Sequence, residues 1–301
     1  MHDSEDAPRS WRPLLKSLQR VFLLLAVVGI GVYLLANRDA VGTTFEKMDP
    51  RWLAPAAVWL GLLHPVMAYV YWCIQRGLGI ERSYRRTLTS YIARLPARFV
   101  PGGVWHSLAR YADIHNDDDA SAAKLGGLFV LEVIAVASGG CLASGVLAWS
   151  IIDARQSVHP LALLVMAAGV AGSLVPFVLP RWRRHMRGAS HWFAAIIAVG
   201  IVWTSVGATF ALVARAIGGP FLQCASSALS ATYTTAATAG YAAIFAPQGW
   251  GVTDAVFALL RPCPIPLAAL LSAILAYRLV TIVVDICIWA AGSMLARSRT
   301  D

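Results

Sequence analysis

Four basic side chains lie in or just before the stretch RFVPGGVWHSLARY, residues 98–111, which is broken by a proline and two glycines. Arginine guanidinium groups bind phosphate and carboxylate oxygens through paired N–H donors. A helix interrupted at proline and glycine also frees backbone N–H groups, and its positive dipole end stabilises an anion. The stretch therefore predicts a binding site for an anionic or polar group. Its candidate residues are Arg94, Arg98, Pro101, Gly102, Gly103, His106 and Arg110.

A related break occurs later in the chain, in APQGWGVTD at residues 246–254. Shifting the sequence by the 146 positions between Pro101 and Pro247 superimposes a Phe-x-Pro-x-Gly pattern on both breaks. Segments 93–139 and 239–285 are therefore predicted to be copies in an internal repeat. In the second copy, Gly249 and Asp254 are the candidate site residues.

Each break is followed, at the same distance, by an ionisable residue in an apolar segment. Glu132 lies 31 residues after Pro101, and Arg278 lies 31 residues after Pro247. A lone charge at the bilayer centre costs about 3 kcal/mol on insertion scales. Because opposite charges at related positions are less costly as a pair, we predict that Glu132 and Arg278 approach each other. Asp285, on the same helical face as Arg278, is the alternative partner.

The elements that must position these residues are apolar helices. Of the 301 residues, 58% are hydrophobic and 14% are charged, whereas a soluble domain has about 25% charged residues. The apolar runs are continuous rather than alternating, which predicts helices that cross a bilayer and not barrel strands. We predict an all-α polytopic membrane bundle of about seven or eight spans, with two re-entrant or broken helices in a two-fold internal repeat.

The predicted elements follow from hydropathy along the chain. Residues 1–20 are expected to be a cytoplasmic interfacial segment, residues 21–295 a single transmembrane domain and residues 296–301 a tail. The two broken segments lie at 87–111 and 246–254. The predicted spans are at residues 21–36, 52–73, 125–152, 158–179, 191–213, 221–245 and 267–295.

The net charge of +9 comes from short basic clusters between apolar segments. The clusters at 9–20, 76–86 and 181–187 fall on one side of the predicted topology, which places the N-terminus in the cytoplasm. The pattern argues against a nucleic-acid partner and favours nearby anionic lipid headgroups. With this topology, the tail falls on the outer side unless one broken segment crosses the membrane.

Other sequence features give no sign of an enzyme. The five cysteines lie in or beside apolar segments without a CxxC pair, and we expect them to be packing residues, not a disulfide or metal site. The acidic run NDDD at 116–119 is expected to cap the next helix. No Walker loop, GxGxxG or HExxH occurs. We expect no catalytic residue, metal or cofactor. A transferase acting on a lipid-linked donor remains an alternative.

The stretch RFVPGGVWHSLARY followed by Glu132, and PQGWGVTD followed by Arg278, resemble the lysylphosphatidylglycerol synthase transmembrane family. This is the flippase-like membrane domain of the multiple peptide resistance factor, and the resemblance covers about residues 20–295. Gln248 stands where the family usually has glycine, and Asp254 where it has glutamate. The resemblance implies a bundle with re-entrant elements in a bacterial inner membrane. The soluble aminoacyl-transferring domain is not in this sequence, so we do not expect synthesis of lysylphosphatidylglycerol.

The resemblance also implies a function: moving lipids or lipid-linked groups between leaflets. We expect a translocase for a polar or anionic headgroup of a phospholipid, hopanoid or polyprenyl-linked lipid. The basic residues at the first break would attract the headgroup, and Glu132, Arg278 and Asp285 would form a switchable ion-pair network. The alternative is a non-transporting membrane partner of a lipid-modifying enzyme or glycosyltransferase. A second copy of the chain and a separate lipid-modifying enzyme are the candidate protein partners.

Overall fold

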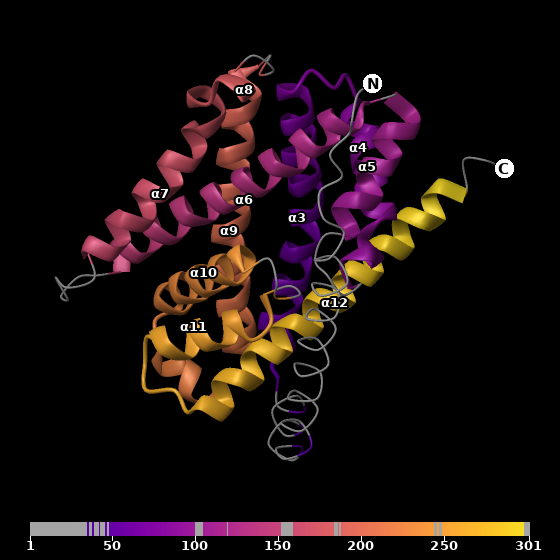
Figure 1. Ribbon diagram of the computed structural model, residues 1–301. Helices are drawn as coiled ribbons and strands as arrows, with labels where there is room; N and C mark the ends of the chain where they lie inside the picture. The colour runs from indigo at the N-terminus through magenta and orange to yellow at the C-terminus, as the bar shows by residue number, and fades with distance from the viewer. Residues whose placement is uncertain are drawn as a thin grey trace, which may run out of the picture.

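A computed structural model describes residues 48–99, 105–118, 120–151, 159–183, 188–243 and 249–297, together with residues 35, 38, 42, 46, 186 and 246. These residues form helices and contain no strand (Figure 1). Five of the helices are long and apolar enough to cross a membrane. They are α3 (Pro50–Gly77), α6 (Ala122–Ile151), α7 (His159–Val178), α9 (Ala189–Ile217) and α12 (Leu267–Arg297). The predicted all-α membrane bundle is thus confirmed.

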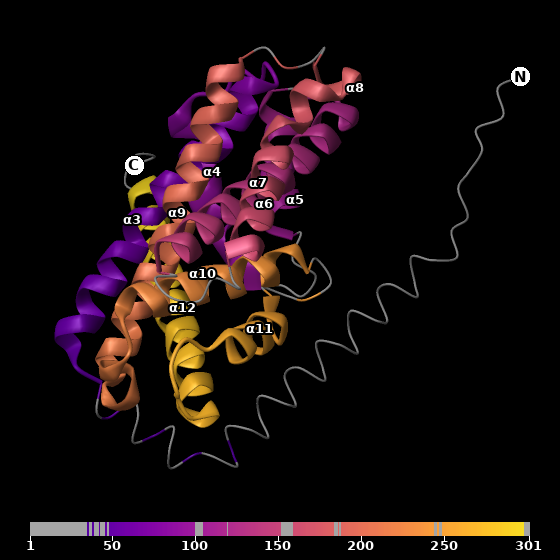
Figure 2. The ribbon, with the colours of Figure 1, turned by 90° about the vertical axis from the view of Figure 1, so that its left-hand side faces the viewer.

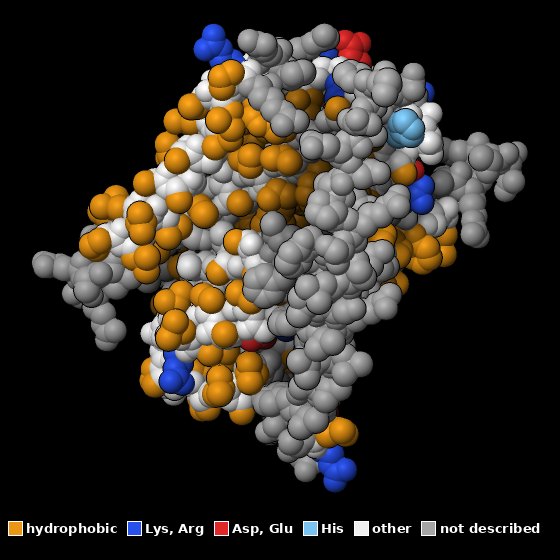
Figure 3. All heavy atoms as spheres, viewed as in Figure 1, with side chains coloured by type: hydrophobic (Ala, Val, Ile, Leu, Met, Phe, Trp, Pro, Cys, Tyr) orange, Lys and Arg blue, Asp and Glu red, His pale blue; other side chains and the backbone are white. Residues whose placement is uncertain are grey.

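The surface of the bundle is that of a protein surrounded by lipid. Large aliphatic side chains on the outer flanks, such as Leu164 and Ile197, are about two-thirds exposed. Figure 3 shows hydrophobic side chains covering the flank formed by α6 and α7, with charged side chains at the top of the view. The predicted interfacial segment and all of the first predicted span except residue 35 lie outside the described residues.

Shorter helices occupy the gaps between the spans. Between α3 and α6 lie α4 (Tyr84–Ala93), the 3-10 helix η1 (Leu95–Phe99) and α5 (Trp105–Asp118). Between α9 and α12 lie η3 (Gly219–Gln223), α10 (Ser226–Ala242) and α11 (Val252–Leu260), and α8 (Pro180–Arg183) joins α7 to α9.

The prediction that residues 221–245 form a sixth membrane span is wrong. Its helix, α10, has 17 residues, a length of about 25 Å at 1.5 Å per residue, against a hydrocarbon core of about 30 Å. In both ribbon views α10 lies at a steep angle to α9 (Figures 1 and 2). Hydropathy does not separate such a helix from a span because both are apolar.

A disulfide shows that α10 and α11 form a hairpin. Cys224, just before α10, is bonded to Cys263, just after α11. The chain therefore enters and leaves this segment at one point. The expectation that the cysteines only pack is wrong for this pair, because the fold brings together two residues that are 39 positions apart. Cys73, Cys141 and Cys287 are free.

The helices α4 and α5 form a second hairpin, without a disulfide. Arg82, just before α4, donates from Nη1 to the carbonyl oxygen of Asp113 near the end of α5, at 3.5 Å. At the start of α6, Lys124 donates from Nζ to the carbonyl oxygen of Gly79, at 3.3 Å. This hairpin therefore begins and ends beside the C-terminal end of α3.

The two hairpins enter the bundle from opposite ends. The spans that precede them, α3 and α9, are antiparallel: the Asp49 amide donates to the Ala216 carbonyl oxygen at 2.8 Å, and at the other end Gly77 packs against Met186 and Gly188. The order long helix, short helix, break, short helix, long helix therefore occurs twice in opposite orientations, as α3 to α6 and as α9 to α12. The helix α7 connects the two halves.

The structure also shows where the tail begins, which the sequence left open. Both hairpins return to the end at which they entered, so α12 finishes at the end of the bundle where α3 and α8 finish (Figure 1). The tail therefore starts on the same side as the basic clusters that follow α3 and α7. Of the two sequence-based alternatives, the one with the tail on the other side counts α10 as a span.

Candidate functional site

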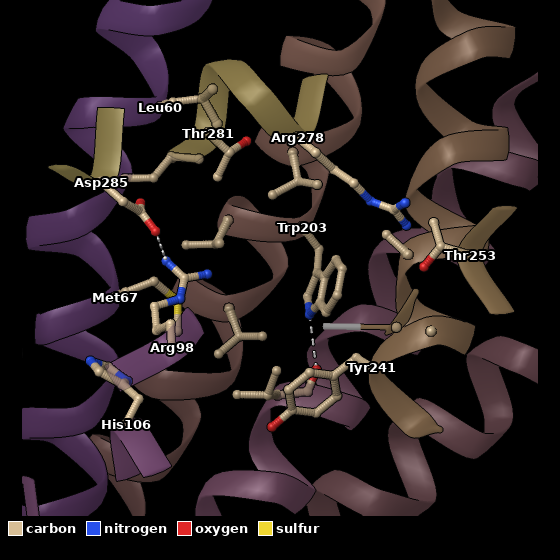
Figure 4. Close-up of a pocket in the computed structure, with 18 of the residues that line it drawn as sticks. Leu60, Met67, Arg98, His106, Trp203, Tyr241, Thr253, Arg278, Thr281 and Asp285 are labelled. Carbon is tan, nitrogen blue, oxygen red and sulfur yellow. Dashed lines mark hydrogen bonds and ion pairs between the residues drawn. The ribbon is translucent and has the colours of Figure 1, made fainter. Parts of the chain in front are cut away.

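A cavity of about 410 Å³ lies between the two halves of the bundle. Its walls come from both hairpins and from α3, α6, α9 and α12. Much of the lining is apolar or aromatic, but the described lining also includes six arginine, histidine or carboxylate side chains: His64, Arg98, His106, Glu132, Arg278 and Asp285. In Figure 4, Arg98 and Asp285 lie on one side of the cavity and Arg278 on the other.

Glu132 of α6 is held by the first hairpin. Its Oε1 atom forms an ion pair with Arg110 of α5, and the two side chains are only 7% and 3% exposed. Ser107 donates to Oε1 at 3.1 Å, and the Tyr111 hydroxyl donates to Oε2 at 2.5 Å. The Arg110 guanidinium also lies 3.7 Å from the ring centroid of Tyr71. Both carboxylate oxygens of Glu132 therefore accept hydrogen bonds, and Arg110 neutralises the negative charge.

Arg278 of α12 is held by the second hairpin in the same manner. Its Nη1 and Nη2 atoms donate to the two carboxylate oxygens of Asp254, at 3.2 and 2.9 Å. The carboxylate of Asp254 also accepts from the backbone amide of Gly251 at the start of α11, at 2.8 Å. The guanidinium lies 4.9 Å from the ring centroid of Trp250.

The predicted ion pair between Glu132 and Arg278 is therefore wrong. Both residues line the same cavity, but each is neutralised by the short helix of its own half. In the first half, the short helix supplies the cation and the long helix the anion. In the second half the charges are exchanged. A short helix packed against each long helix offers a nearer counter-ion than the opposite half does.

Asp285 is likewise not the partner of Arg278. Its Oδ2 atom accepts from Arg98 Nη1 at 2.9 Å, and its Oδ1 atom lies 3.2 Å from His64 Nε2. The carboxylate is 3% exposed, whereas the Arg98 side chain is 37% exposed. The other ring nitrogen of His64 lies 3.2 Å from the Tyr91 hydroxyl. Asp285 thus joins α3, η1 and α12, and Arg98 is its accessible partner.

His106 and Arg94 occupy different surroundings. His106 lines the cavity, and its Nε2 atom lies 3.4 Å from the carbonyl oxygen of Tyr91, which only a protonated nitrogen can approach favourably as a donor. Arg94 does not line the cavity. It forms a two-pronged ion pair with Asp113, at 2.6 and 3.1 Å, nearer the end of the bundle. Arg94, predicted as a site residue, therefore lies outside the cavity lining.

Partial burial raises the pKa of the Asp113 carboxyl, but the hydrogen bonds from Arg94 and Ser90 outweigh this effect and hold that pKa below its ordinary value. Ser90 donates to Oδ2 at 2.6 Å. The Arg94–Asp113 pair thus links the C-terminal end of α4 to α5.

The break residues themselves are only partly described. Pro101, Gly102 and Gly103 lie outside the described residues, as does Pro247. In the second break, Gly249 lines the cavity and has a φ of +69°, a conformation that favours glycine. A Cβ on Gly249 would lie 2.7 Å from the Cα of Gly240 in α10. Position 249 therefore requires glycine for two reasons: its positive φ and its close approach to α10.

Sequence reasoning missed several polar members of the site. His64, which directly precedes Pro65, belongs to no motif, and neither do the tyrosines that line the cavity. These tyrosines are Tyr71, Tyr91, Tyr233, Tyr241 and Tyr277. Their recurrence in apolar segments was the available signal, but tyrosine is common at membrane interfaces.

The described residues contain no group of side chains suited to a metal ion. The acidic run at 116–119 is not the cap of the next helix. Its first three residues belong to α5, and the Lys124 amide donates to the Ser121 hydroxyl at 3.4 Å at the start of α6.

Comparison with known proteins agrees with this architecture. The family described as "Lysylphosphatidylglycerol synthase TM region" matches residues 21–288 of the chain. No curated protein matches the chain.

Proposed function

The chain belongs to the lysylphosphatidylglycerol synthase transmembrane family, and from this premise we propose that it moves lipid headgroups between the two leaflets of a membrane. The observation that carries the proposal is the charged cavity between two inverted halves of a lipid-exposed bundle. Ionisable groups inside a membrane are costly and mark pathways for polar substrates. Inverted repeats with interrupted helices are typical of transporters with a binding site near the bilayer midplane.

The ion pairs give this proposal a mechanism. Arg98 is the only arginine at the cavity, within the described chain, whose carboxylate partner is also bonded to a histidine. A headgroup phosphate can take Arg98 from Asp285 while His64 still holds the carboxylate. The Arg110–Glu132 and Arg278–Asp254 pairs keep each hairpin attached to its long helix. Opening one hairpin at a time would expose the cavity to one leaflet at a time.

The orientation follows from charge and from the disulfide. The basic clusters lie at the end of the bundle where α3 finishes, and that end is proposed to be cytoplasmic. Cys224 and Cys263 lie at the opposite hairpin base, where an oxidising compartment would allow their bond. In this proposal the location is a bacterial inner membrane with a cytoplasmic N-terminus, the partner is a membrane lipid, and the chain is not an enzyme.

Purified protein in liposomes tests the proposal. Fluorescent phospholipid moving to the outer leaflet would be measured by quenching with dithionite, for the wild type, Arg98→Gln and Asp285→Asn. Both variants are expected to slow transfer at least tenfold. Arg94→Gln, the control, is expected to leave the rate close to that of the wild type, because neither Arg94 nor its partner Asp113 lines the cavity.

Equal rates for the wild type, Arg98→Gln and protein-free liposomes would contradict the proposal. That result, with a lipid-modifying enzyme co-purifying from the native membrane, would favour the alternative of a non-transporting membrane partner.

A further inference from the structure

Resting on the proposed function, we infer that the preferred headgroup is zwitterionic with no net charge, combining a phosphate with an ammonium group. The charges around the cavity carry this inference. The described part of the lining holds two arginines, Arg98 and Arg278, and two carboxylates, Glu132 and Asp285. Behind them, Arg110 and Asp254 add one charge of each sign. The site is balanced, so it has no net attraction for an anion or a cation.

The balance of positive and negative charge matters because the charged side chains of the site are already paired with one another. Each cavity arginine is bonded to a carboxylate, Arg98 to Asp285 and Arg278 to Asp254. A phosphate that takes Arg98 away from Asp285 leaves a buried carboxylate whose remaining partner is His64. An ammonium group on the same ligand can take the place of Arg98 at Asp285. A zwitterion therefore exchanges partners one for one, whereas a simple anion leaves an uncompensated charge in a medium of low polarity.

The surroundings of Asp285 suit an ammonium group. His64 connects Asp285 to the Tyr91 hydroxyl, and the rings of Tyr91 and Tyr71 are 5.6 Å apart between centroids. Tyr91 and Tyr277 line the cavity, whereas the Tyr71 ring already carries the Arg110 guanidinium. Electron-rich ring faces beside a carboxylate attract ammonium and quaternary ammonium groups. The partly exposed arginine Arg98, which is bonded to Asp285, provides the phosphate contact.

Liposome transfer assays with acyl-labelled lipids test the charge preference. The probes are phosphatidylcholine and phosphatidylethanolamine, which are zwitterionic, phosphatidylglycerol, which is anionic, and a cationic trimethylammonium diacylglycerol. The wild type is expected to move both zwitterionic lipids at least fivefold faster than the other two. Phosphatidylglycerol moving as fast as phosphatidylcholine would overturn the inference but leave the proposed function intact. Failure to move any lipid would overturn the proposed function instead.

Two variants separate charge selection from a general loss of activity. Asp285→Asn leaves the site with one excess positive charge and is expected to shift the rate ratio towards phosphatidylglycerol. Arg98→Gln leaves one excess negative charge and is expected to shift it towards the cationic lipid. Arg94→Gln, the control, should keep the wild-type ratio. Ratios unchanged in both cavity variants would overturn the inference, because a folding defect lowers all rates without reordering them.

A binding measurement gives a result that does not depend on transport. In detergent, added phosphatidylethanolamine is expected to raise the unfolding temperature of the wild type more than phosphatidylglycerol does, and Asp285→Asn should reverse the order. Stronger stabilisation of the wild type by phosphatidylglycerol would overturn the inference.

Discussion

Replacing Glu132 with glutamine should strongly destabilise the first half of the bundle. The substitution keeps the shape of the side chain but removes the negative charge that neutralises Arg110. Both side chains are almost completely buried, and Glu132 accepts further hydrogen bonds from Ser107 and Tyr111. The Arg110 guanidinium would remain buried against Tyr71 without a counter-ion.

Two arguments give the size of the expected loss in unfolding free energy. Breaking a buried ion pair by removing one partner costs about 3–5 kcal/mol. Unit charges about 4 Å apart attract one another by about 4 kcal/mol at an effective dielectric constant of 20. We therefore expect Glu132→Gln to lower the free energy of unfolding by about 4 kcal/mol. Arg110→Gln together with Glu132→Gln removes both charges and should cost less than the two single changes together, with a coupling energy of about 3 kcal/mol.

The assay is reversible unfolding in mixed micelles, followed by tryptophan fluorescence, for the wild type, both single variants and the double variant. The Arg94–Asp113 pair provides the matched control, because its side chains are 46% and 18% exposed and such a pair is expected to couple by at most about 1 kcal/mol. If the coupling at Arg110 and Glu132 is no larger than in the control pair, the reasoning from burial is refuted.

Three further predictions concern the hairpins. In denaturing detergent, a maleimide should label three cysteines without reductant and all five with it, since Cys224 and Cys263 are bonded; five labels before reduction would disprove the bond. The lowered pKa of Asp113 implies a stabilisation that is complete above the unfolded value of about 3.9 and is lost as the pH falls through the lower folded value. The stability difference between wild type and Asp113→Asn should therefore hold from about pH 5 to 8 and shrink below about pH 4; a difference independent of pH would contradict it. A Cβ on Gly240 would overlap Thr253 and approach Gly249 to 3.2 Å, so Gly240→Ala should lower the unfolding free energy by about 1–3 kcal/mol. Gly200→Ala, with nothing within 4 Å of its Cβ, should be neutral or stabilising, and equal effects of the two would refute the packing argument.

The sequence by itself determined the class of the fold and the positions of the buried charges. Continuous apolar runs fix membrane helices, because the bilayer leaves a polar backbone no other partner. The span predicted at 191–213 lies within α9, and the one at 125–152 coincides with α6 to within a few residues. The matched breaks also placed Glu132 and Arg278 correctly at the cavity between the halves, because the repeat preserves the distance from break to charge.

Only the tertiary structure decided which charged side chains pair and which apolar helices cross the membrane. Glu132 and Arg278 find partners 22 and 24 residues away on the adjacent short helices, a choice made by the packing of each hairpin. Asp285 reaches Arg98 across 187 residues of sequence, and Cys224 reaches Cys263 because α10 and α11 fold back. Hydropathy records how apolar a segment is but not its tilt or its neighbours. Those depend on contacts between distant parts of the chain, which periodicity along one segment does not encode.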